Sequence, residues 1–167
     1  DTLISVKPIQ ENQEVLLVTK QGQAIRFNSK EARPIGRAAY GVTGIKLNTN
    51  DEVVSLEVLK PGFSVLTITK KGYGKRSKIE DYRLTARAGK GVINIKISSK
   101  NGEVIKSQCV KDNDNIIVTT TKGIVIRTSV KNIRIMGRAT QGVRIIRLQE
   151  KDSVGDLVRV KVVEDEN

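Results

Sequence analysis

Residues 70–97 hold two segments, KKGYGKRSK at 70–78 and RLTARAGKGVINIKI at 83–97, whose outline recurs on both sides of them. In each copy a glycine follows a short β-rich run, an Arg-Ala pair comes fifteen residues later, and a Gly-Val pair comes next. The copies are offset by 50 and then 51 residues. Such a period, filled with short strands, is typical of a blade-by-blade array rather than of a single enzyme core. The repeated glycines and arginines are Gly22, Gly72, Gly123, Arg37, Arg87 and Arg138.

Each copy predicts four short strands, which in the first copy are residues 15–19, 23–28, 42–47 and 52–59. The first run is apolar without alternation, which favours a strand covered on both faces, and Gly22 suits a tight hairpin turn. In the third strand of each copy, apolar residues alternate with Lys46, Lys96 and Arg147, so the cations should face outward. Four antiparallel strands per unit predict an all-β fold, a propeller-like fragment of about three four-stranded blades.

The repeats organise the chain as one array without long linkers. Residues 1–9 align with residues 51–59, so we expect 1–10 to be the closing strand of a preceding unit and further repeats to lie upstream. Blades are expected at 11–61, 62–111 and 112–163, and a short acidic tail at 164–167. Three blades are too few to close a conventional ring, so we expect an arc in which neighbouring blades could exchange strands.

Composition favours a polyanionic partner and argues against catalysis. The net charge is +12, and histidine, the commonest acid-base group and metal ligand, is absent. We find no apolar run long enough to span a membrane, no signal peptide, and no motif for a metal or another cofactor. The single Cys109 suits a reducing compartment and is expected to be a small buried hydrophobe. Aromatic residues make up 3% of the chain, so duplex DNA is a better candidate than stacked single strands.

The candidate DNA contacts are cations at equivalent places in successive units. On a curved array they would form a stripe, and a duplex that followed it would have to bend. Arg87 is the best of the loop arginines, because Lys90 and two glycines next to it would let a phosphate approach the backbone. The full set is Arg26, Arg37, Lys46, Lys71, Lys75, Arg76, Lys78, Arg87, Lys90, Lys96, Arg127, Arg138 and Arg147.

Each part of this set has a structural alternative. The loop arginines could hold loop carbonyls with their guanidinium groups. The mid-strand arginines Arg26, Arg76 and Arg127 could equally form structural ion pairs. A charge-rich face could also be merely solvated. We expect the three tyrosines, Tyr40, Tyr73 and Tyr82, to have surface or packing roles, because they occupy non-equivalent positions.

Four motifs resemble the C-terminal domain family of bacterial DNA gyrase A. They are YGKR at 73–76, YRLT at 82–85, GKGVINIK at 89–96, and IMGR at 135–138 leading to TQGVR at 140–144. The similarity covers essentially the whole chain. The family's defining heptapeptide, QRRGGKG, is not present, and residues 86–91 are only a degenerate version of it.

The resemblance implies a β-pinwheel that wraps duplex DNA around a basic rim, of which this chain would be roughly half. It implies a cytoplasmic, nucleoid-associated protein. The other partners would be the remaining blades and N-terminal part of the same polypeptide, and gyrase B, which hydrolyses the ATP for negative supercoiling. No catalytic residue carries over. The alternatives are the sister domain of topoisomerase IV and a protein-interaction scaffold with incidental basic charge.

Overall fold

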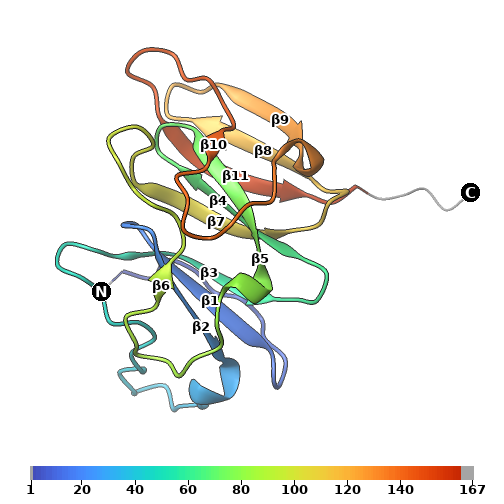
Figure 1. Ribbon diagram of the computed structural model, residues 1–167. Helices are drawn as coiled ribbons and strands as arrows, with labels where there is room; N and C mark the ends of the chain where they lie inside the picture. The colour runs from blue at the N-terminus through green and yellow to red at the C-terminus, as the bar shows by residue number, and fades with distance from the viewer. Residues whose placement is uncertain (1, 163–167) are drawn as a thin grey trace, which may run out of the picture.

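The computed structural model describes residues 2–162, which form three antiparallel sheets following one another along the chain (Figure 1). The only helices in this range are three-residue 3-10 turns, η1 (Ser29–Glu31), η2 (Ile79–Asp81) and η3 (Val130–Asn132). The predicted all-β architecture of three sheets is confirmed. The strands are β1 (Glu14–Thr19), β2 (Gln23–Asn28), β3 (Val53–Leu59), β4 (Ser64–Thr69), β5 (Tyr73–Lys78), β6 (Val92–Ile93), β7 (Val104–Val110), β8 (Asn115–Thr120), β9 (Val125–Ser129), β10 (Val143–Arg144) and β11 (Val154–Val160).

Each sheet is built on a hairpin and a closing strand. In the first sheet β1 lies between β2 and β3, with Leu16 opposite both Arg26 and Glu57. The hairpin turns at Gly22, whose φ of 85° lies in the region that favours glycine. The arrangement repeats in β4, β5 and β7 and again in β8, β9 and β11. Three of the four strands predicted for each unit are therefore present.

The third predicted strand is not a full strand in any unit. Residues 42–47 form no strand, and in the later units only β6 and β10 remain, each two residues long. These two strands pair with the hairpin of the preceding unit, β6 with β2 and β10 with β5, so neighbouring units exchange a strand. The alternation within the segment holds, since Ile45, Ile95 and Ile146 are buried and the cations that follow them are exposed. The alternation shows only that one side of the segment is buried. An irregular segment can bury one side as well as a strand can, so the alternation did not establish a strand.

The closing strand expected at residues 1–10 is also absent among residues 2–10. Closing strands in this fold pair with the first strand of their own hairpin, and the described residues contain no such hairpin for this segment. The predicted acidic tail lies outside the described residues.

The core lies between successive sheets. One cluster joins the first two sheets through side chains such as Leu16, Val65 and Tyr82, and a second joins the last two through Leu66 and Ile116. Contacts between strands of neighbouring sheets involve chiefly the closing strands β3, β7 and β11. The sheets are therefore closest at that edge, while the swapped strands β6 and β10 lie at the opposite edge.

Cys109, on β7, is buried as expected, and burial raises the pKa of its thiol to about 12. No helix among residues 2–162 is long and apolar enough to cross a bilayer. Within the same range, no group of three or more Cys, Asp or Glu side chains is placed to hold a metal ion.

Candidate nucleic-acid interface

Three loops cover the edge of the array that lies opposite the closing strands. We call residues 30–47, 80–97 and 131–148 the rim loops. The second and third loops each reach back to the preceding unit: the Thr85 amide donates to the Arg26 carbonyl at 2.9 Å, and the Met136 amide donates to the Arg76 carbonyl at 2.9 Å. Both loops are therefore hydrogen-bonded to the outer strand of the preceding hairpin, β2 for the second loop and β5 for the third.

Successive rim loops are also bonded to one another. The Ala88 amide donates to the Gly44 carbonyl at 2.6 Å, and the Lys46 amide donates to the Gly89 carbonyl at 2.8 Å. The Lys96 amide makes the corresponding bond to Thr140, also at 2.8 Å. The three loops thus form one continuous ribbon of backbone along the rim.

This ribbon carries most of the charge of the chain. Its 54 residues hold 13 cations and three carboxylates, a net charge of +10 out of the total of +12. Among the described residues, none of the 13 forms an ion pair with a carboxylate. The charge is therefore available to an external anion. The rim cations are Lys30, Arg33, Arg37, Lys46, Arg83, Arg87, Lys90, Lys96, Lys131, Arg134, Arg138, Arg144 and Arg147.

Two rows of exposed cations run along the rim from unit to unit. One row is Lys46, Lys96 and Arg147, all in the predicted set and all exposed. The other is Arg33, Arg83 and Arg134, which also occupy equivalent positions and are all exposed. The second row was missed by the sequence prediction. The fifty-residue offset could have found it, because the three arginines recur with the same spacing as the loop arginines that were selected.

The loop arginines Arg87 and Arg138 act within the protein. Arg87 donates from Nε to the Glu31 carbonyl at 3.1 Å and from Nη1 to the Thr43 carbonyl at 2.9 Å. Arg138 likewise donates to the carbonyls of Asp81 and Ile93. Both side chains are half-buried, whereas Arg37 is exposed and has no such contact among the described residues. The alternative that these arginines hold loop carbonyls therefore applies to Arg87 and Arg138.

The mid-strand arginines divide in the same way. Arg26 pairs with Glu14 at 2.5 Å and donates to the Tyr82 carbonyl at 2.9 Å. Arg76 is 5% exposed, pairs with Asp112 at 2.5 Å and donates to the Ile133 carbonyl at 2.7 Å. Both link their hairpin to the turn of the next unit, so the structural alternative applies to them.

Arg76 and Lys75 were both expected to contact DNA, and their burial corrects that expectation. Lys75 is 0% exposed and donates from Nζ to Ser77 Oγ at 2.5 Å. Desolvation, with a smaller contribution from nearby Arg138, lowers the pKa of Lys75 to about 7. The other units carry isoleucine at this position, at Ile25 and Ile126, so Lys75 occupies a place that the fold reserves for a core side chain.

The remaining predicted cations are all exposed, and of them only Lys90 lies on a rim loop. Arg127 is exposed and has no hydrogen-bond partner among residues 2–162. Lys71 lies in the turn before β5 and Lys78 is its last residue, both outside the rim loops, and the Lys71 ammonium donates to the Ser99 carbonyl. Lys90 is exposed on the second rim loop.

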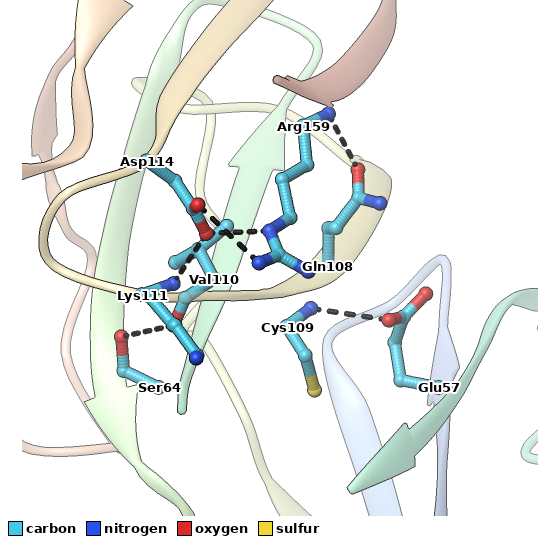
Figure 2. Close-up of polar contacts among 8 residues, drawn as sticks. All are labelled: Glu57, Ser64, Gln108, Cys109, Val110, Lys111, Asp114 and Arg159. Atoms are coloured by element: carbon cyan, nitrogen blue, oxygen red, sulfur yellow. Dashed lines mark hydrogen bonds and ion pairs between the residues drawn. The ribbon is translucent and has the colours of Figure 1, made fainter. Parts of the chain in front are cut away.

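Two cations near the closing strands pair with buried carboxylates, in contrast to the cations of the rim. Asp114 is 3% exposed and accepts hydrogen bonds from Nε of Arg159 at 2.5 Å and from the Lys111 amide at 2.7 Å (Figure 2). Glu57, 6% exposed, accepts the Cys109 amide at 3.1 Å and lies 3.4 Å from the ammonium of Lys7. A cavity of about 680 Å³ opens beside these groups. The buried carboxylates thus pair with Lys7 and Arg159 at this edge, whereas none of the 13 rim cations is ion-paired within the described residues.

The tyrosines occupy packing and surface positions. Tyr82 is fully buried and donates to Asn94 Oδ1 at 2.5 Å, and Tyr73 is buried beneath the guanidinium of Arg144. Tyr40 is fully exposed.

Comparison with known proteins gives the family. The family model described as DNA gyrase C-terminal domain, beta-propeller, matches residues 13–60, 64–111 and 114–161. The DNA gyrase A protein of Chlamydia muridarum is 42% identical over 97% of this chain, which covers 20% of that protein. A solved gyrase A C-terminal domain superposes with a TM-score of 0.86 at 25% identity over 92% of this chain and 52% of the other. The C-terminal domain of a DNA topoisomerase IV gives 0.83 at 26% identity over 89% and 47%.

Proposed function

Because the chain belongs to the family of DNA gyrase C-terminal β-propeller domains, we propose that it binds duplex DNA along the rim loops and bends it. The observation that carries the proposal is the charge of the rim. The rim loops hold 13 cations and only three carboxylates, and none of these cations is ion-paired within the described residues. A polyanion whose charges are regularly spaced is the natural partner of a row of cations that recurs from unit to unit.

Phosphate contact is expected rather than base reading. The longest helices in the described part of the chain are three residues, so no helix is present there to enter a major groove. The exposed rim cations stand on irregular loops and are long flexible side chains, which suit phosphate contacts that carry no sequence information. Binding should therefore be largely independent of sequence.

Bending follows from where the rim lies. The sheets approach most closely at the closing strands and the rim loops lie at the opposite edge, so the rim is the convex side of the array. A duplex that contacts all three loops must curve toward the protein. Smooth bending by 40–90° over a 20–30 base-pair site costs about 1–6 kcal/mol, which contacts from several cations can offset by counterion release.

The chain spans about a fifth of the length of the curated relatives it matches, so the role of the whole protein is part of the proposal. We assign this chain to the non-catalytic DNA-wrapping region of a cytoplasmic gyrase A protein, working with gyrase B in ATP-dependent supercoiling. Topoisomerase IV is the second candidate, since the two solved domains match equally well at 25% and 26% identity. The 42% identity to a gyrase A sequence favours gyrase.

The topology of a ligated plasmid tests the bending. A nicked circle is ligated in the presence of increasing amounts of this chain, and the linking number of the purified product is measured. A shift that grows with protein and appears equally on circles of unrelated sequence supports wrapping. Binding without any shift would show adhesion alone, and a shift confined to one sequence would show base reading.

A further inference from the structure

A cavity of about 490 Å³ opens between the second and third units, beside the paired strands β5 and β10. The second unit contributes the turn before β5 and the turn at residues 98–102, and the third unit contributes the end of its rim loop. We call it the Tyr73 cavity. The lining side chains that carry the argument are Lys71, Tyr73, Lys100, Arg144, Arg147 and Asp152.

The ring of Tyr73 positions two of these cations. Tyr73 is 8% exposed, and the Lys100 ammonium and the Arg144 guanidinium lie over its ring, 5.4 and 5.3 Å from the ring centroid. Arg144 also donates from Nη2 to the Tyr73 hydroxyl at 2.9 Å. A cation over an aromatic ring is attracted to the ring face. The two charges are therefore restrained on one rigid platform, whereas the cations of the rim rows stand on long flexible side chains.

The Tyr73 hydroxyl adds a neutral donor to the cavity. A phenol hydroxyl can both donate and accept hydrogen bonds, and this one accepts the bond from Arg144. Among residues 2–162 its own hydrogen has no acceptor. An oxygen atom of a bound anion would supply that acceptor.

The charge of the cavity is not neutralised by the protein. No ion pair within the described residues involves its four cations, which are Lys71, Lys100, Arg144 and Arg147. The Asp152 carboxylate is bonded within its own turn, where Oδ1 accepts the Lys122 amide at 3.1 Å and the Ser153 amide at 2.8 Å. The cavity therefore keeps an excess of positive charge.

The boundary between the first and second units lacks this chemistry. Its residues at the positions of Lys71, Tyr73 and Arg144 are neutral and not aromatic, namely Gln21, Gln23 and Ile93. The turn at residues 98–102, which carries Lys100, is also one residue longer than the corresponding turns at 48–51 and 149–152. Contacts with the backbone of a long duplex should recur from unit to unit, as the two rows of rim cations do. Cations that gather at one boundary and not at the other indicate a local ligand.

The size and charge of the cavity indicate the class of that ligand. Pockets for small ligands measure about 300–1,000 Å³, a range that includes this cavity. Arginine and lysine bind phosphate oxygens through charge-assisted hydrogen bonds. Four cations and a hydroxyl donor exceed the needs of a single phosphate, whereas two linked phosphates present more oxygen atoms in a compact group.

We propose that the Tyr73 cavity binds a compact anion with two or more linked phosphates, that is, a pyrophosphate group, either free or carried by a nucleotide. The cations are positioned before the anion arrives, so little side-chain entropy is lost on binding. The site does not depend on the proposed binding of duplex DNA by the rim.

Calorimetric titration without DNA tests the ligand class. The chain should bind one pyrophosphate saturably, and orthophosphate, which reaches fewer of the donors, should bind roughly tenfold more weakly or worse. ATP carries the same group, so tighter binding of ATP would assign the group to a nucleotide and weaker binding would assign it to a free polyphosphate. Absence of saturable pyrophosphate binding, or equal binding of pyrophosphate and orthophosphate, would overturn the proposal.

Two triple variants locate the site. The cavity variant is Lys71→Gln, Lys100→Gln and Arg144→Ile, and it should weaken pyrophosphate binding roughly 100-fold or more, because each lost hydrogen bond between charged groups costs about tenfold. The control variant loses the same charge from exposed residues that do not line the cavity, and it should bind pyrophosphate as the unmodified chain does. Equal losses would show general charge attraction and would overturn the proposal. The control changes are Lys60→Gln, Lys111→Gln and Lys161→Gln.

Two further measurements do not depend on the folding of a triple variant. Tyr73→Phe keeps the ring and all four cations, and the loss of the hydroxyl donor should weaken pyrophosphate binding roughly tenfold. In the unmodified chain, pyrophosphate should shift the amide NMR signals of residues 71–73 and 143–147 most. Unchanged affinity of Tyr73→Phe, or the largest shifts elsewhere in the chain, would contradict the site.

Discussion

Arg76 and Arg127 occupy the same position in successive units, and the structure predicts opposite consequences for their removal. Arg76→Ala leaves the Ile133 carbonyl, bonded at 2.7 Å, without its donor and opens space inside the protein. It also removes the 2.5 Å pair with Asp112, but that carboxylate is 70% exposed and returns to water, so the pair adds little. An unsatisfied buried acceptor costs about 1–3 kcal/mol, so with the lost packing we expect a destabilisation of about 2–3 kcal/mol.

Arg127→Ala removes an exposed side chain with no partner among the described residues, so we expect a change within about 0.5 kcal/mol. Thermal unfolding monitored by circular dichroism, at a protein concentration where the chain is monomeric, measures the stability change of each variant. For a chain of this length, Arg76→Ala should lower the melting temperature by about 4–12 °C and Arg127→Ala should leave it unchanged. Equal losses for the two variants would refute the assignment of Arg76 as a structural link between units.

Three further predictions concern buried groups. Burial lowers the pKa of Lys75 to about 7, so the destabilisation caused by its buried charge is fully present below pH 7 and fades as pH rises toward the usual lysine range. Lys75→Ile should therefore raise the melting temperature more at pH 6 than at pH 10, and an equal gain at both would contradict this. Tyr82→Phe should destabilise by about 1–3 kcal/mol in urea unfolding because Asn94 loses its buried donor, whereas Tyr40→Phe, at an exposed position, should have no effect. Cys109, whose pKa burial raises to about 12, should react with a thiol reagent only after denaturation; fast labelling of the folded chain would contradict its placement.

The repeat was sufficient to predict the hairpins and closing strands. Gly22, Gly72 and Gly123 mark turns that any chain with these β-rich runs would make locally. The exchanged strands are different, because β6 bonds to β2 in the hairpin of the preceding unit rather than to the hairpin of its own unit. A periodic pattern does not say which sheet receives a strand, so strand exchange could be foreseen only as a possibility.

The candidate site, like the fold, was only partly predictable from the sequence. Equivalent spacing selected cations such as Lys46 and Lys96, which the structure leaves exposed. It could not separate them from Arg76, since both recur and only the three-dimensional contact with Ile133 makes one of them structural. Lys75 shows the limit most plainly, because isoleucine at both equivalent positions was the available sign that this lysine faces the core.

Two matched triple variants test whether the rim is the DNA-binding surface. Arg33, Arg83 and Arg134 replaced by Gln lose three exposed rim charges, and Lys60, Lys111 and Lys161 replaced by Gln lose three exposed charges at equivalent positions beyond the closing strands. Each triple lowers the net charge from +12 to +9, so the two lose the same charge from different places on the protein.

The measurement is duplex affinity as a function of salt concentration. If the three rim arginines contact phosphates, their loss should reduce the slope of log affinity against log salt by about 2.7 and weaken binding roughly 500-fold at 0.1 M salt, while the control triple changes neither by a comparable amount. Equal effects of the two triples would show that net charge alone governs binding and would contradict the rim as the DNA interface.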